Sequence, residues 1–271
     1  MVGAAGVLAL LAATGIGVTI GATKPVGIGW VAFAAMVGGV ALSRRAGEKR
    51  PATLVWGSGL ASGAMIVSVG LFLLPDALNH HAKFGGLGVA TGVIVGFAAH
   101  AVGHRLSHVD LPMDATVAQL TAHAAAAGAI IGVVYGNMPE LGPLLGVAIV
   151  SHKGPAGYAA ADRLQRNGRS WYPILLPAAG VGVVAVLSSA VALPASAPVN
   201  GLVFGFATGV FLHVAMDFLP RCELGSEVHE ALSVEGDAHA VLDRLRLHAV
   251  ASTLLGGGVV VLLWRLVSHG A

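Results

Sequence analysis

Long uncharged stretches separated by short polar loops repeat along the whole chain. A helix needs roughly 20 apolar residues to cross the hydrocarbon core of a bilayer, and most of these stretches are about that long. They are Val2–Thr23, Val26–Ser43, Ala52–Leu74, Phe84–Gly103, Ala115–Met138, Leu141–Ala161, Ser170–Leu193, Gly201–Leu219 and His248–Trp264, where Lys153 interrupts the sixth and Asp217 is the one charge of the eighth. The pattern predicts an all-α, polytopic membrane helical bundle of about nine transmembrane helices in a single domain, residues 1–271.

Composition supports a membrane protein and excludes several other classes. Charged residues make up 10% of the chain, against roughly 25% in soluble domains, which is too few for a cytosolic enzyme or a disordered chain. The net charge of +2 excludes a basic nucleic-acid binder, and no phosphate-loop motif indicates a nucleotide site. The first stretch has no basic region before it and no obvious cleavage site, so we expect a retained helix rather than a signal peptide.

Basic residues predict the orientation in the membrane. With nine spans and a cytoplasmic N-terminus, the outward loops hold only Lys24 and Lys83. The inward loops then hold Arg44, Arg45, Lys49, Arg50, Arg105, Arg163, Arg166, Arg169, Arg221, Arg244 and Arg246. This bias follows the positive-inside rule. We therefore expect a multi-pass protein of the cell (plasma) membrane with an external C-terminus and an acidic cytoplasmic loop, Arg221–Leu247.

Two histidines in neighbouring spans are the first candidate site. His123 lies near the middle of its span and His152 near the middle of the next, and a short turn joins the two. Both imidazoles should therefore lie at a similar depth. A single buried histidine is more often a hydrogen-bonded core residue than a ligand, but two at matched depth favour a metal site.

The residues after His152 predict a broken helix. Pro155 should remove a backbone donor and free carbonyls near residues 151 and 152. Transporters use such breaks at their substrate sites. A plain proline kink with nothing bound is the alternative interpretation.

Further polar residues lie along a path across the membrane. His213 and Asp217 share one helical face at i and i+4, as a ligand pair or as a structural hydrogen bond. His100 and His104 have the same spacing at the inner end of their span, where they would chelate a metal or form a wet interfacial face. Met65 offers a soft thioether, although a lone methionine is usually core packing. Asp76, His80 and His81 would lie on the outer side as an entrance.

These features together resemble the ZIP family of divalent metal transporters. The matching segments are Ser62–Met65 through Leu74–Leu78, His123–Gly128, His152–Gly157 and Gly205–Pro220. The resemblance implies an eight-helix core over residues 26–267, with residues 1–23 as an extra N-terminal helix. It also implies a two-metal centre halfway across the membrane and transport by an elevator-like movement of a helix bundle.

The chain departs from the family pattern at the acidic positions. Ala127 and Ala156 stand where the family motifs carry glutamates, so both bridging carboxylates are missing. The remaining ligands would be His123 and His152, with Met65 as a third and water or His213 completing the shell. Such neutral nitrogen and sulfur ligands favour zinc over magnesium or calcium. Our hypothesis is that the Lys153 ammonium takes the place of the second metal, which leaves a one-metal site.

The sequence therefore predicts a transporter, not an enzyme, that moves Zn²⁺ into the cytoplasm as its substrate, with Cd²⁺, Fe²⁺, Mn²⁺ and Co²⁺ as alternatives. No organic cofactor is expected. Glycine-rich faces and the family resemblance also suggest a homodimer. One alternative is an intramembrane zinc hydrolase of the ceramidase kind with His123, His152, His213 and Asp217 as ligands, although a second midplane carboxylate to act as base is missing. The other alternative is a metal sensor that does not transport.

Overall fold

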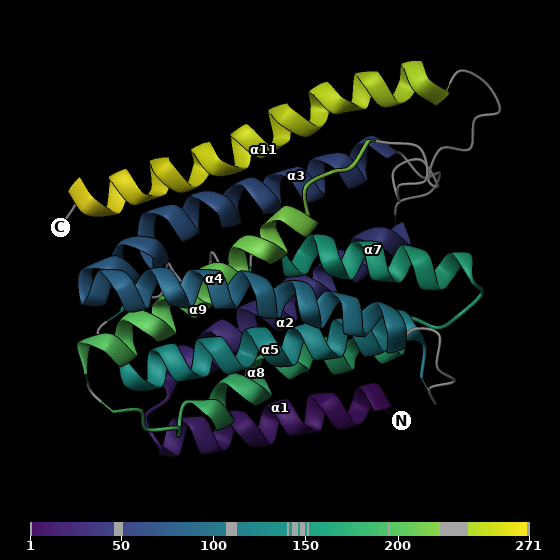
Figure 1. Cartoon of the computed structure of the whole chain (residues 1–271). Coiled ribbons are helices and arrows are strands. Elements are labelled where there is room, and N and C mark those ends of the chain that lie inside the picture. Colours follow the sequence, from purple (N-terminus) through teal and green to yellow (C-terminus); the bar gives the residue numbers. More distant parts are fainter. Residues whose placement is uncertain are drawn as a thin grey trace.

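The computed structural model describes residues 2–45, 51–106, 113–139, 141–142, 146, 150, 152–194, 196–222 and 238–269. Regular structure in this part of the chain is entirely helical (Figure 1). The helices are α1 (Val2–Thr19), α2 (Thr23–Arg45), α3 (Pro51–Ser68), a π-helical turn (Val69–Leu73), α4 (Leu74–Leu106), α5 (Ala115–Asn137), α7 (Lys153–Arg166), a 3-10 turn (Tyr172–Ile174), α8 (Leu175–Ser188), α9 (Ala197–Asp217) and α11 (Ala238–His269).

Six helices of the described part are long and apolar enough to cross a bilayer, which indicates a multi-pass membrane protein. They are Val2–Thr19, Thr23–Arg45, Ala52–Ala99, Ala115–Asn137, Ala197–Asp217 and Ala240–Leu266, and Tyr172–Ser188 is a shorter apolar helix. The expected nine spans are not confirmed as a number. The stretch from Leu141 to Ala161 lies partly outside the described residues, and α7 is its helical remainder.

The third and fourth expected spans, 52–74 and 84–103, are separated by a break at His81. The π-helical turn continues α3 directly into α4, so the first of these two helices runs past Leu74. The break comes later, at His81, whose backbone is extended (φ −165°, ψ 105°). The chain turns back on itself at this break, since a β-carbon at Gly85 would lie 2.4 Å from the Ala77 carbonyl oxygen. The rest of α4 then runs antiparallel to α3 (Figure 1).

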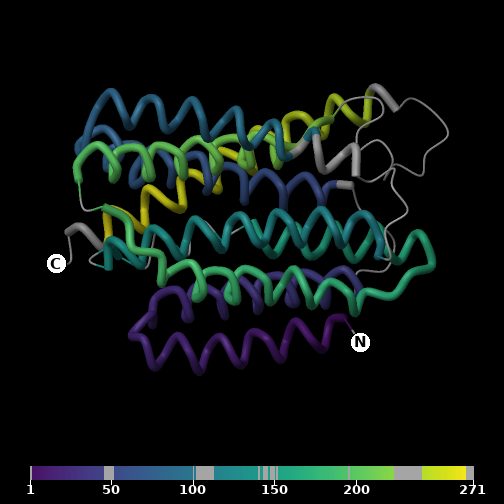
Figure 2. Tube along the Cα trace, turned by 60° about the horizontal axis from the view of Figure 1, so that its bottom comes forward, coloured from purple at the N-terminus to yellow at the C-terminus, as the bar shows by residue number. Residues whose placement is uncertain are grey.

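The helices form two groups that run side by side (Figures 1 and 2). In the four-helix group, α4 packs along α9, α3 packs along α11, and α3 also contacts α9. In the five-helix group, α8 packs against α1, α2 and α5, and α2 packs along α7. Between the two groups, α3 touches α7 and α5 touches α9 less extensively. A buried cluster that includes Ile28, Met65, Ala124 and Phe204 joins the groups.

Glycines permit the closest packing in the four-helix group. A β-carbon at Gly88 of α4 would lie 2.5 Å from the carbonyl oxygen of Leu202, and one at Gly205 of α9 would lie 2.2 Å from that of Gly85. Real β-carbons do not approach oxygen so closely, so only glycine allows these two backbones to touch. Such backbone contact is typical of membrane helices, which associate through small residues.

The two chain termini lie at opposite ends of the bundle (Figures 1 and 2). Arg44 and Arg45 occupy the last turn of α2, and Arg163 and Arg166 the last turn of α7. Both of these helix ends lie at the same end of the bundle as the N-terminus (Figure 1). Basic side chains thus gather at one end, as the sequence predicts, and the assignment of that end to the cytoplasm belongs to the proposal below.

Candidate metal site

His123 and His152 meet between the two helix groups. His123 projects from α5, and His152 immediately precedes α7. Their Nε2 atoms lie 3.0 Å apart and their rings are nearly perpendicular, at 74°. His152 is completely buried and His123 is half-buried. The structure therefore brings together the two histidines that the sequence places at a common depth.

The separation of the two nitrogens is close to that of a metal site. Two imidazole nitrogens bound at 2.0–2.1 Å to one tetrahedral zinc ion lie about 3.3 Å apart. An opening of a few tenths of an ångström would let both nitrogens face one ion. Without metal, one imidazole donates a hydrogen bond and the other accepts it.

Lys153 is the most deeply buried charged side chain beside this pair. It is 0% exposed, and its Nζ atom has no hydrogen-bond partner among the described residues. Of the charged or titratable groups, Lys153 and His213 lie near enough to His123 to act on it electrostatically. The sequence-based placement of Lys153 next to the histidines is therefore consistent with the geometry.

The expected break at Pro155 takes a different form. The helix α7 begins at Lys153, so Pro155 lies in its first turn, where a missing N–H removes no helical hydrogen bond. The carbonyl of His152 accepts a hydrogen bond from the Ala156 N–H at 3.0 Å. The expectation that Pro155 frees this carbonyl is thus wrong, and residue 151 lies outside the described residues.

Phe218, which the sequence analysis did not single out, covers His152 from the four-helix group. It follows α9 directly, and its ring centroid lies 5.2 Å from that of His152. A phenylalanine at the end of an apolar span carries no signal of a site. Only its contact with His152 in the folded chain identifies it.

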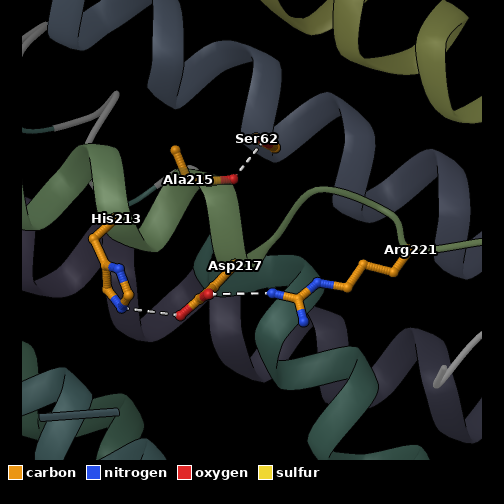
Figure 3. A network of polar contacts seen from close by, with 5 residues as sticks. All are labelled: Ser62, His213, Ala215, Asp217 and Arg221. Atoms are coloured by element: carbon orange, nitrogen blue, oxygen red, sulfur yellow. Dashed lines mark hydrogen bonds and ion pairs between the residues drawn. The ribbon is translucent and has the colours of Figure 1, made fainter. Parts of the chain in front are cut away.

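His213 and Asp217 form a separate pair in α9, as Figure 3 shows. The Nε2 atom of His213 lies 3.2 Å from Asp217 Oδ2, and the other carboxylate oxygen lies 3.4 Å from the Arg221 guanidinium. Ser62 of α3 holds the same helix by donating a hydrogen bond of 2.6 Å to the Ala215 carbonyl. The i, i+4 spacing thus brings the two side chains to ion-pair distance, but this contact does not have the geometry of a hydrogen bond.

The expected ligand shell is not assembled in this arrangement. Within the described residues, no three His, Cys, Asp or Glu side chains lie close enough together to hold a metal ion. His213 and Asp217 therefore do not join His123 and His152 here, because Asp217 binds His213 and Arg221 instead. Met65 is 2% exposed and belongs to the same buried cluster as Ala124, next to His123.

The remaining candidate residues belong to α4, which precedes His123 and His152 in the chain. His80 stacks on Phe204 with ring centroids 5.4 Å apart, and His81 accepts a hydrogen bond of 3.3 Å from the Phe84 N–H at the bend. Asp76 is half-buried in the first turn of α4. His100 and His104 belong to α4, but their side chains lie outside the described residues, as does most of the expected acidic loop, 223–237.

Tyr135 fixes the chain between the two site helices and was also missed by the sequence analysis. Its hydroxyl donates a hydrogen bond of 2.8 Å to the Gly142 carbonyl and accepts one of 2.9 Å from the Gly146 N–H. Lys24 binds the same connection through the carbonyls of Pro139 and Leu141. The short turn expected here was visible in the sequence, but the partners of its backbone were not.

The chemistry of the pair follows from these contacts. Two imidazoles and the buried amine of Lys153 bring nitrogen atoms together, and the nearby Asp217 carboxylate is paired with His213 and Arg221. Among the described residues, these contacts position no general base beside the pair. No family model matches the chain, and no curated protein matches it.

Proposed function

We propose that this chain is a plasma-membrane transporter that moves a divalent transition-metal ion, with zinc as the expected ion, into the cytoplasm. The observation that carries the proposal is the contact between His123 and His152, at 3.0 Å between Nε2 atoms, in the interior of a bundle of apolar helices. Ionisable residues are rare within membranes and usually mark a pathway or a site.

The identity of the ion rests on the donors. Imidazole nitrogen and thioether sulfur suit zinc and its neighbours, whereas magnesium and calcium require oxygen. The buried Lys153 supports a centre for one metal rather than two, because its side chain lies beside the pair and repels a second cation when it is protonated.

The arrangement of helices supports alternating access. His123, His152 and Lys153 belong to the five-helix group, whereas Met65, His213 and Phe218 belong to the four-helix group. The pair lies where the groups face each other. Sliding of one group past the other would carry the ion on the five-helix group from the entrance near His80 and His81 toward the basic end of the bundle. The nine spans, the cytoplasmic N-terminus and the external C-terminus belong to this proposal.

A zinc hydrolase is less well supported. Such an enzyme needs about three protein ligands, an open water position and a base. The candidate base is Asp217, but its two carboxylate oxygens are paired with His213 and Arg221. A metal sensor would bind the ion without moving it, so a measurement of ion flux distinguishes a sensor from a transporter.

The proposal is tested by zinc and cadmium uptake into proteoliposomes that contain the full chain. Saturable uptake by wild type and its loss in the His123→Ala/His152→Ala variant are expected. His248→Gln is the matched control, because this imidazole contacts Trp56, away from the pair. Tight zinc binding without flux would reject the transporter proposal and favour the hydrolase or the sensor.

A further inference from the structure

Lys153 presents a chemical imbalance that the proposed metal site does not resolve. An ammonium group has three donors and no acceptor. That of Lys153 is completely buried and has no hydrogen-bond partner among the described residues. A buried charge without a partner costs several kcal/mol in a protein interior, and the same holds inside a membrane.

A bound metal ion increases the imbalance. His123 and His152 are neutral ligands, so a divalent ion between them would bring two further positive charges next to Lys153. The Asp217 carboxylate already lies between His213 and Arg221, and Asp162, farther along α7, pairs with Arg166 at 3.2 Å. Ala127 and Ala156, at the positions where the motifs of the resembled family carry glutamates, supply no carboxylate.

The start of α7 adds to the attraction for negative charge. This helix has 14 residues and begins at Lys153. First-turn N–H groups have no partner within their own helix, and the helix dipole places partial positive charge there. His152 occupies the capping position, but its side chain makes no capping hydrogen bond. Pro155 in this turn has no N–H, so the N–H groups of Lys153 and Gly154 are what the helix start adds to the buried Lys153 side chain.

We propose that Lys153 and the first turn of α7 bind a small monovalent anion beside His123 and His152. The anion supplies the negative charge that carboxylates would otherwise provide. The anion site stands on Lys153 and α7 alone, whereas its coupling to metal rests on the proposed function. Because the anion neutralises the ammonium, metal and anion raise each other's affinity by the same factor.

Chloride is the probe, with gluconate as the large replacement anion at constant ionic strength. The first measurement is binding of radioactive chloride to the metal-free full chain in nanodiscs. The second is zinc affinity in chloride and in gluconate. Wild type should bind chloride. Its zinc affinity should be about fivefold or more higher in chloride than in gluconate. Lys153→Met should bind no chloride and should show one zinc affinity in both salts.

Two variants separate charge from folding. Lys153→Arg retains the positive charge and should retain the chloride dependence, even if Lys153→Met does not fold. Lys83→Met removes an exposed lysine of α4 and should behave as wild type. Absence of chloride binding by wild type, or equal chloride dependence in wild type and Lys153→Met, overturns the proposal.

The experiment also separates this proposal from that of transport. Chloride binding that depends on Lys153, with neither zinc binding nor flux, retains the anion site and rejects the transporter. Zinc uptake that depends on His123 and His152 but is the same in both salts retains the transporter and rejects the anion site.

Discussion

Gly96 of α4 lies directly against the imidazole of His213 in α9. A β-carbon at Gly96 would come within 2.8 Å of His213 Cδ2 and 2.9 Å of Cγ. The absence of a side chain at one position therefore sets the orientation of the histidine on the facing helix, and with it the His213–Asp217 pair.

Gly96→Ala should push the imidazole away from α4 and weaken its contact with Asp217. Overpacking of this kind costs about 1–3 kcal/mol, so we expect a lower melting temperature and slower metal uptake. The matched control is Gly86→Ala in the same helix, where a β-carbon meets nothing within 4 Å. That change should be neutral or stabilising by up to about 1 kcal/mol. Equal behaviour of the two variants would contradict the role given to Gly96.

Tyr135→Phe should loosen the connection between α5 and α7. The variant loses the hydroxyl that binds both Gly142 and Gly146, and a buried backbone group left without its partner costs about 1–3 kcal/mol. We expect a lower melting temperature and weaker zinc binding, because this connection leads to His152. Tyr172→Phe changes a tyrosine that is 62% exposed and should alter neither quantity.

The sequence was sufficient for the all-helical class and for the meeting of His123 with His152. Hydrophobic stretches report span positions directly, and matched depth on adjacent helices places the two rings near each other. The sequence was not sufficient for the contacts that depend on helix rotation and bending. The turn residues between the third and fourth spans did not specify that the break falls at His81, and Phe218 became part of the site only through its contact with His152.

The position of Pro155 shows a second limit. A proline within an apolar stretch predicts a kink when the helix starts well before it. Here α7 starts two residues earlier, so the same proline is compatible with a regular first turn. Helix starts are poorly determined where no capping residue marks them, and His152 makes no side-chain cap.

Phe218→Ala should uncover His152. The phenyl ring lies 5.2 Å from the imidazole, and its removal leaves space that water can enter. We expect faster modification of His152 by diethyl pyrocarbonate, and a loss of stability of up to about 3 kcal/mol because the ring is only half-buried. Phe97→Ala removes a phenylalanine that is 64% exposed and should leave the modification rate unchanged. An unchanged rate in Phe218→Ala would show that other groups shield His152.

Cys222 should react slowly with maleimides at neutral pH. Burial raises the pKa of its thiol, and Arg246 only partly offsets the shift. The neutral thiol is therefore favoured in the folded chain, so this contribution to stability is present below the ordinary thiol pKa and is lost as the pH rises through the raised value. Labelling should accelerate with pH and on unfolding in detergent. Arg246→Gln should slow it further, and faster labelling in this variant would contradict the electrostatic argument.

Gly57 of α3 and Pro155 of α7 provide a test of movement between the two helix groups. A β-carbon at Gly57 would lie 3.9 Å from the β-carbon of Pro155, and disulfides join β-carbons about 3.5–4.5 Å apart. In a Cys222→Ala background, oxidation of the Gly57→Cys/Pro155→Cys variant should stop zinc uptake, and reduction should restore it. The matched control joins Gly180 of α8 to Ala124 of α5, within the five-helix group, where the corresponding distance is 3.7 Å. That cross-link should leave uptake insensitive to oxidation. Full uptake with the first cross-link formed would show that the groups do not move relative to each other at this contact.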